Sequence, residues 1–274
     1  MAARRRAGYS VAMQTQLAPI GEQVRHWRQR RRLSQLDLAC EAEISTRHLS
    51  FIETGRAAPS REMILHLAES LDVPLRQRNS LLLAAGFAPL FQERSLDHPA
   101  LRPAREAIET LLGAHEPYPA LAIDRHWNLI AANRAITPLM AGAAAELLKP
   151  PINVLRLSLH PRGLAPRIAN LPEWRDHLLF RLGRQFAETA DPVLSDLLAE
   201  LAAYPDGGAR RAARDLSAIA IPLQFRTTSG VLSLLSTTMM FGAPLEPTLA
   251  ELALETFLPA DAATAEALRA MMAK

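Results

Sequence analysis

Hydrophobic residues recur at helical spacing along the first third of the chain. Ile20, Val24 and Trp27 lie at i, i+4 and i+7, which predicts an amphipathic helix over residues 20–31. Four further short helices are expected, each marked by residues that typically cap or end a helix: Ser34, Ser45, Gly55, Ser60, Pro74 and Gly86. Because two of these helices are separated by a turn of only about three residues, the segment predicts an all-α bundle of five helices that contains a helix-turn-helix.

The pattern changes after a short helix expected over residues 104–112. The string PALAIDRHWNLIAANRA holds two apolar runs around a polar turn, and the segments 219–227 and 231–242 flank a second turn, so two β-hairpins are predicted. Two helices are expected between the hairpins, and one or two more are expected to close the chain after Pro247. This order predicts an antiparallel sheet with helices on one side, so the second domain is of the α+β class.

Length and composition support two domains. A chain of 274 residues exceeds the roughly 150 residues of a typical domain. The polar, proline-containing segment 92–103 is interpreted as a linker. We therefore expect a basic arm without fixed structure at 1–19, a DNA-binding domain at 20–91 and a second domain at 104–274.

Charge is unevenly distributed between these domains. Residues 1–94 contain 14 arginines and no lysine against nine acidic residues, a net charge of +5, whereas residues 95–274 carry a net charge of −2. The basic first domain favours an anionic partner, either nucleic acid or a membrane surface. No apolar run approaches the roughly 18 residues of a membrane span, no secretory signal follows the first arginines, and Cys40 is the only cysteine. We expect a soluble, cytoplasmic protein that has no disulfide and does not bind membranes.

The segment LSQLDLACEAEISTRHLSFIETGRAAPS, residues 33–60, closely resembles the repressor-type (XRE) helix-turn-helix class of bacterial regulators. The resemblance implies that the helix after Ser45 enters the major groove of a double-stranded operator. It implies that Gln35 contacts phosphate and that Thr46, Arg47 and Ser50 face bases, and it adds Ser45 and Phe51 to the interface. Arginine can donate two hydrogen bonds to guanine, which is the commonest specific contact.

The resemblance to this class also has consequences for the turn and for the number of subunits. Many members of this class have glycine in the turn where this chain has Glu43, and a residue forced to positive φ there costs about 1–2 kcal/mol. One short recognition helix contacts few base pairs, so a homodimer on two half-sites is expected.

The second domain resembles the PAS fold, and the whole chain resembles the MmyB-like regulators. The second resemblance is carried by RHLSFIETGRAAPS, LLLAAGFAP, HEPYPALAIDRHWNLIAANRA, NVLRLSLHPRGLAPRIANLPEW and FGAPLEPTLAELALETFLPADAAT. It implies a transcription factor whose PAS-like domain binds a small apolar ligand, with fatty acids as the associated class. A pocket for an acyl chain needs apolar walls and a polar group for the carboxylate. The candidate walls include Leu121, Ile123, Trp127, Leu234 and Met240, and the candidate carboxylate partners are Arg156, His160 and Arg167.

Two alternatives to ligand binding stay open at this point. Catalysis is disfavoured because the chain has no phosphate-binding glycine loop, no nucleophile elbow and no histidine spacing that suggests a metal site. The second domain could instead hold haem or flavin, with His126, His160 or His177 as an axial ligand, or act only through protein contacts. Only 5% of the residues are aromatic, which disfavours a flat cofactor, so no cofactor is expected.

Overall fold

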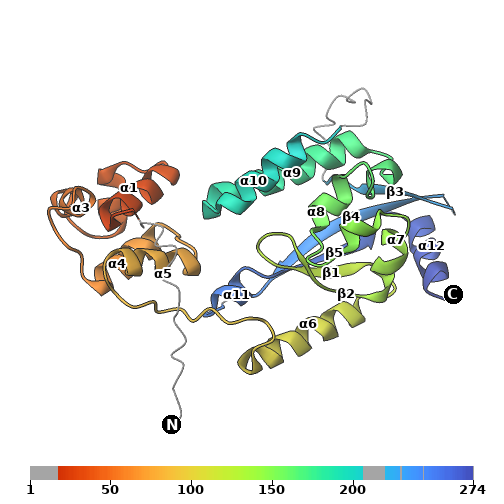
Figure 1. Ribbon diagram of the computed structural model, residues 1–274, viewed down its shortest axis with the longest axis horizontal. Helices are drawn as coiled ribbons and strands as arrows, with labels where there is room; N and C mark the ends of the chain where they lie inside the picture. The colour runs from red at the N-terminus through yellow and green to blue at the C-terminus, as the bar shows by residue number, and fades with distance from the viewer. Residues whose placement is uncertain (1–17, 206–219, 229, 243, 274) are drawn as a thin grey trace, which may run out of the picture. The chain divides into compact units, whose positions relative to one another are not determined.

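The computed structural model describes residues 18–205, 220–228, 230–242 and 244–273, which fall into two compact units, Met1–Gln92 and Glu93–Lys274. The first unit is helical and the second contains a five-stranded antiparallel sheet with helices (Figure 1), so the predicted two-domain α+β class is confirmed. The basic arm with Arg4, Arg5 and Arg6 lies outside the described residues.

The first unit contains the five predicted helices. They are α1 (Ile20–Arg30), α2 (Gln35–Glu41), α3 (Thr46–Glu53), α4 (Arg61–Ser70) and α5 (Leu75–Ala84). Serine hydroxyls cap three of them: Ser34, Ser45 and Ser60 each accept a hydrogen bond from the backbone N–H three residues later, at 3.1, 3.1 and 3.2 Å. At α2 the Asp37 carboxylate in turn accepts a hydrogen bond from the Ser34 N–H, which completes a capping box.

A close helix contact fixes the packing of this unit. A side chain at Gly21 would place its Cβ 2.3 Å from the carbonyl oxygen of Ile52, so α1 can approach α3 only with glycine at this position. Val24 and Trp27 on α1 and Leu49 and Ile52 on α3 are buried in the resulting core. The periodic apolar positions of the sequence therefore form the core as expected.

The turn between α2 and α3 has the strained geometry that the sequence suggested. Glu43 has φ 49°, in the left-handed region that favours glycine. Its N–H donates to the Cys40 carbonyl at 3.2 Å, and the Ile44 N–H donates to the Ala39 carbonyl at 2.9 Å. The turn keeps the geometry of the helix-turn-helix and accepts the cost of a non-glycine residue.

The second unit is built on one sheet. Its strands are β1 (Ala120–Ile123), β2 (Leu129–Ala132), β3 (Leu223–Thr227), β4 (Gly230–Met240) and β5 (Ala253–Pro259), in the order β2-β1-β5-β4-β3. Its α-helices are α6 (Arg102–Ala114), α7 (Thr137–Met140), α8 (Val154–Leu159), α9 (Leu171–Thr189), α10 (Pro192–Ala202), α11 (Pro247–Ala250) and α12 (Ala262–Met272). Short 3-10 helices cover Pro99–Leu101, Arg134–Ile136, Ala145–Leu148 and Ala165–Arg167.

Strand β5 corrects the sequence analysis. Both predicted hairpins are present, and the two helices α11 and α12 follow Pro247 as expected, but the sequence analysis missed the strand between these helices, which is the central strand of the sheet. Glu255 pairs with Leu121 on one neighbouring strand and with Thr238 on the other. A short apolar run that is covered on both faces lacks the alternation of a half-buried strand, so its pattern does not separate helix from strand.

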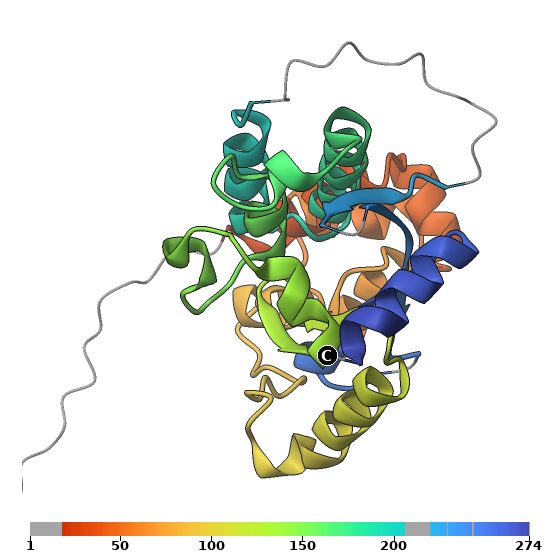
Figure 2. The ribbon, with the colours of Figure 1, turned by 90° about the vertical axis from the view of Figure 1, so that its right-hand side faces the viewer.

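Helices lie on both faces of the sheet, so the expectation of helices on one side is wrong. Leu121 and Ile123 of β1 join a core with α8, α9 and α10, whereas Ala120 and Ala122 join a second core with Ile108 and Leu112 of α6. Figures 1 and 2 both show α6 separated from α9 and α10 by the sheet. Strand β1 thus contributes alternate residues to two cores.

The segment predicted as a linker contacts the second unit. The Arg94 N–H donates to the Glu246 carboxylate at 2.8 Å, and the Thr248 hydroxyl donates to the Arg94 carbonyl at 2.6 Å.

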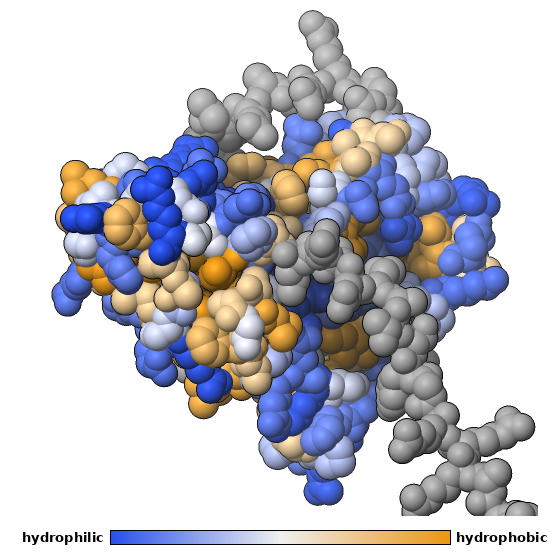
Figure 3. Space-filling model, turned by 60° about the vertical axis from the view of Figure 1, so that its left-hand side comes forward, coloured by the Kyte–Doolittle hydropathy of each residue, from blue (hydrophilic) through white to orange (hydrophobic). Residues whose placement is uncertain are grey.

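On the surface, hydrophobic residues occur in patches among hydrophilic ones (Figure 3). None of the described helices is long and apolar enough to cross a bilayer.

Candidate DNA-binding helix and ligand cavity

Helix α3 has one buried face and one exposed face. Leu49, Ile52 and Glu53 are buried, whereas Thr46 and Arg47 are exposed in the first turn. The Ser45 hydroxyl is used by the helix itself, because it accepts the His48 N–H. The predicted base-facing residues Thr46 and Arg47 therefore lie at the N-terminal end of an outward-facing surface, and Ser50 and Phe51 are partly buried beside them.

The ring of Phe51 makes cation–π contacts with two arginines. The Arg47 Cζ lies 5.3 Å from the centroid of the Phe51 ring, and the Arg56 Cζ lies 5.9 Å from it. Such cation–π contacts restrict the side chains and stabilise them by about 0.5–1 kcal/mol at exposed sites. The sequence analysis did not single out Arg56, although its position just after Gly55 is the one available signal.

Gln35, predicted to contact phosphate, is held by a buried carboxylate. Its side-chain Nε2 donates to the Glu53 Oε2 at 2.8 Å, while Arg28 donates through Nε and Nη2 to the two oxygens of Glu53 at 2.6 and 2.9 Å. Burial alone would raise the pKa of Glu53, but the hydrogen bonds from Arg28 and Gln35 leave that pKa below its ordinary value. This network links α1, α2 and α3 directly behind the recognition surface.

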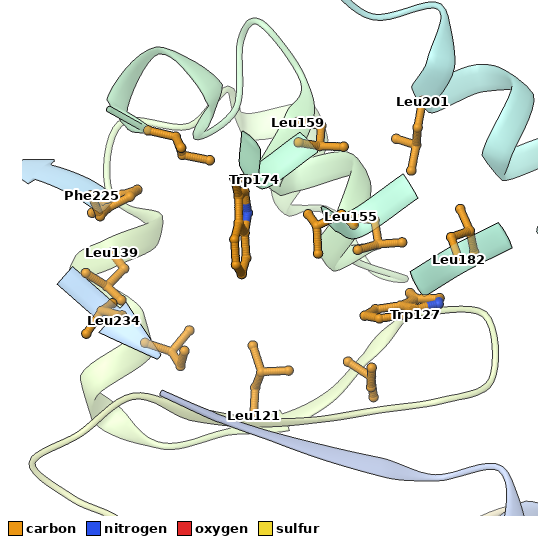
Figure 4. Close-up of a cluster of buried hydrophobic side chains, with 14 of the residues drawn as sticks. Leu121, Trp127, Leu139, Leu155, Leu159, Trp174, Leu182, Leu201, Phe225 and Leu234 are labelled. Atoms are coloured by element: carbon orange, nitrogen blue, oxygen red, sulfur yellow. The ribbon is translucent and has the colours of Figure 1, made fainter. Parts of the chain in front are cut away.

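The second unit contains an apolar cavity of about 110 Å³ between the sheet and α7, α8 and α9. Figure 4 shows Trp174 of α9 pointing toward Leu121 of β1, with Phe225 and Leu234 to one side and Trp127 to the other. Among the described residues on its wall, only Ser158, Arg181 and Glu255 are neither apolar nor aromatic.

The predicted apolar wall residues are only partly brought together. Leu121, Trp127 and Leu234 line the cavity. Ile123 is buried in the same core but does not lie on the cavity wall. Met240, at the end of β4, is 63% exposed and is not brought to the cavity. Met239 beside it is exposed as well, so this end of β4 is uncovered, which the apolar sequence alone did not indicate.

The predicted carboxylate partners Arg156, His160 and Arg167 all lie off the cavity wall. Arg156 donates two bonds of 2.7 Å to Glu200, His160 packs edge-on against Tyr204, and Arg167 donates to the Leu139 and Ala141 carbonyls. Each is therefore engaged in holding the helices or loops of the domain together.

A different charged pair lies on the wall. Arg181 of α9 donates through Nη2 to Glu255 Oε1 at 2.5 Å and through Nη1 to Oε2 at 3.2 Å. The hydroxyl of Thr238 accepts from Arg181 Nη2 at 2.9 Å and donates to Glu255 Oε1 at 2.8 Å, and the guanidinium lies 5.0 Å from the Trp127 ring centroid. The sequence analysis missed this pair, whose one signal is a carboxylate inside the apolar run ALETFLP.

The three histidines considered as haem ligands also lie off the cavity wall. His126 bonds the Asp191 carboxylate at 2.8 Å, and His177 stacks on Trp174 at 5.4 Å between ring centroids. Burial, with Arg181 nearby, lowers the pKa of His177. The described residues contain no cluster of three His, Cys, Asp or Glu side chains that could hold a metal ion.

Comparison with protein families agrees with both units. A helix-turn-helix domain profile matches residues 19–81, and the profile of the MmyB-like transcription regulator ligand binding domain matches residues 104–271. A search of curated proteins found no match to the chain. The second profile covers more than half of the sequence, and together with the helix-turn-helix it shows that the chain belongs to the MmyB-like transcription regulators.

Proposed function

We propose that this regulator binds a two-part DNA operator as a homodimer, and that a small apolar ligand bound in the second unit changes its affinity for that operator. The ligand class that we propose is a fatty acid or a derivative of one. A helix-turn-helix joined to an MmyB-like ligand-binding domain makes the chain a ligand-regulated transcription regulator. The ligand, the dimer and a cytoplasmic location are the proposed parts.

The apolar wall of the cavity is the observation that carries the ligand proposal. A hydrocarbon chain that enters this cavity gains contacts with Leu, Trp and Phe side chains and meets few polar groups that would hold ordered water. Each methylene that is buried contributes about 0.8 kcal/mol. Affinity should therefore rise with chain length until the cavity is filled.

The size of the cavity bears on regulation. An engineered cavity of about 150 Å³ holds a molecule the size of benzene, and the 110 Å³ cavity is smaller. We therefore expect a long acyl chain to move the walls apart. A ligand can shift DNA affinity only when it binds the DNA-competent and incompetent states differently, and a cavity that must expand provides such a difference.

Recognition by α3 supports the proposed dimer. Its outward surface presents Thr46, Arg47 and Ser50, which is enough for only a few base pairs. Two copies on half-sites about 10–10.5 base pairs apart, or a multiple of that spacing, would provide useful specificity. Sedimentation of the protein with and without operator DNA tests this, and a protein that stays monomeric in both conditions contradicts it.

Calorimetry with graded series of saturated fatty acids and of their methyl esters tests the ligand. The titrations use full-length protein stripped of bound lipid, first alone and then bound to operator DNA. We expect affinity to climb with chain length and then level off, with different values in the two conditions. If neither the acids nor the esters bind at any chain length, the ligand class is wrong, and equal affinities in both conditions would refute the regulatory role.

A further inference from the structure

We propose that the Arg181–Glu255 pair is the point in the cavity that recognises the ligand's polar end, and that it accepts an uncharged hydroxyl or carbonyl group in preference to an ionised carboxylate. This inference rests on the proposed binding of an acyl compound and specifies its chemistry. A fatty alcohol, aldehyde or ester would then be a better ligand than the corresponding fatty acid anion.

The pair introduces charged groups into a wall that is otherwise almost entirely apolar. Among the described wall residues, only Arg181 and Glu255 are charged, and the remaining polar side chain, Ser158, already accepts a bond from the Trp174 indole at 3.2 Å. The polar end of a ligand loses its hydration when it enters such a cavity and needs a hydrogen-bonding partner there. Arg181 and Glu255 are therefore the expected partners.

The charges of the pair already cancel. Two nitrogens of Arg181 donate to the two oxygens of Glu255, and Thr238 closes a triangle with both side chains. The Glu255 side chain is only 5% exposed. Moving Arg181 onto a ligand carboxylate would leave the Glu255 carboxylate buried without a counter-ion, which is strongly unfavourable.

A second anion beside the intact pair is also disfavoured. A ligand carboxylate close to Arg181 would lie close to Glu255, and like charges in a buried site repel each other. His177 could offset the added charge only as a cation, but burial and Arg181 lower its pKa. A fatty acid can thus enter favourably only with its carboxyl group protonated.

An uncharged group leaves the pair intact. The hydrogen bonds from Arg181 to Glu255 and Thr238 use both hydrogens of Nη2 and one of Nη1, so the Nε–H and one Nη1–H have no acceptor among the described residues. A ligand carbonyl can accept from these groups. A ligand hydroxyl can in addition donate to a free lone pair of Glu255.

The test compares three ligands of equal chain length: 1-decanol, methyl decanoate and decanoate. Binding to lipid-stripped full-length protein at neutral pH is followed by tryptophan fluorescence, because Trp127 and Trp174 both lie on the cavity wall. We expect decanol to bind at least about tenfold more tightly than decanoate. Glu255→Gln should shift this ratio toward decanoate by about tenfold or more, because it leaves Arg181 without its counter-ion.

Glu200→Gln is the matched control. It also removes a carboxylate from a two-bond arginine pair, with Arg156, but that pair does not lie on the cavity wall. It should leave the decanol-to-decanoate ratio unchanged. The inference is overturned if unmodified protein binds decanoate as tightly as decanol, or if Glu255→Gln folds and leaves the ratio unchanged.

The order of the three ligands on unmodified protein decides the question even if Glu255→Gln fails to fold. If all three ligands bind but decanoate binds as tightly as decanol or more tightly, only this inference is wrong. If none of them binds, the proposed ligand class fails and this inference fails with it.

Discussion

The guanidinium of Arg47 lies over the ring of Phe51, one helical turn further along α3, with 5.3 Å between the Arg47 Cζ and the ring centroid. The ring limits the directions in which an exposed, flexible side chain can point. An arginine that is already oriented loses less conformational entropy when it donates to a base edge. We therefore expect the pair to orient Arg47 for contact with DNA already in the free protein.

We expect Arg47→Ala to weaken binding to the operator by about 1–3 kcal/mol and to relax the preference at one base pair. Fluorescence anisotropy with the operator and with single-base variants measures both effects. Arg134→Ala is the control, because Arg134 is an exposed arginine of the second unit that pairs with Glu116. Unchanged base preference in Arg47→Ala would show that another residue occupies the base-facing position.

Gln35→Ala should weaken binding to all DNA sequences by a similar factor. Its side chain is partly exposed at the start of α2, and its bond to Glu53 fixes the amide beside the expected phosphate position. Loss of one such hydrogen bond costs about 0.5–1.5 kcal/mol. Binding to operator and to random DNA is compared with that of Leu36→Ala, which removes the exposed neighbouring side chain. A change in the ratio of specific to random binding would contradict a phosphate contact.

Glu43→Gly should stabilise the first unit by about 1 kcal/mol, because glycine removes the strain of positive φ. The greater conformational entropy of glycine in the unfolded chain offsets part of this gain. Glu41→Gly, two residues earlier and within α2, should instead destabilise it by about 0.5–1 kcal/mol. Amide hydrogen exchange in α2 and α3 reports both changes. Equal effects of the two substitutions would refute the strain.

Stability of the first unit should decrease in acid through Glu53. Its pKa is lowered in the folded state, so its contribution is complete above the ordinary value of about 4.3 and is lost as pH falls through the lower folded value. Glu53→Gln should remove this pH dependence and cost about 3–5 kcal/mol at neutral pH, since Arg28 stays buried without its partner. Hydrogen exchange in α1 and α3 measures both, and Glu22→Gln on the exposed side of α1 should change neither.

Leu178→Ala should move the best acyl chain length upward by a few carbons, because Leu178 lines the cavity and its loss enlarges it. The substitution should also cost about 2–5 kcal/mol of stability. Leu197→Ala is the matched control: Leu197 is buried in the same core but not on the cavity wall, so it should lower stability without changing the preferred length. The same preferred length in both variants would place the ligand elsewhere.

Local signals made the first unit predictable. The Ser34 and Ser45 caps and the apolar spacing of α1 and α3 act within one or two helical turns, and the helices begin and end within a few residues of the predicted positions. The strain at Glu43 was also predictable, because the turn geometry of a helix-turn-helix is set by its short length. The same reasoning failed at β5, whose apolar residues have neighbours on both faces.

The polar part of the cavity was not predictable from local signals. Arg156 and Arg167 lie in a segment where charge interrupts apolar residues, and this pattern favoured them as ligand partners. Both instead bond other parts of the fold. Arg181 and Glu255 are 74 residues apart in the sequence. They meet only because α9 packs on the face of the sheet to which the Glu255 side chain of β5 points. Their neighbourhood is a product of topology, which a single sequence does not show.

Strand β1 has a mechanical consequence for signalling. Its successive side chains belong to different cores, with Leu121 against the cavity and Ala122 against α6. Because both cores are closely packed, a ligand that displaces the β1 backbone on the cavity side also disturbs the contacts of Ala120 and Ala122 with α6. Helix α6 is the first long helix after the boundary between the two units. We therefore expect filling of the cavity to change the packing of α6, the helix next in sequence to the DNA-binding unit.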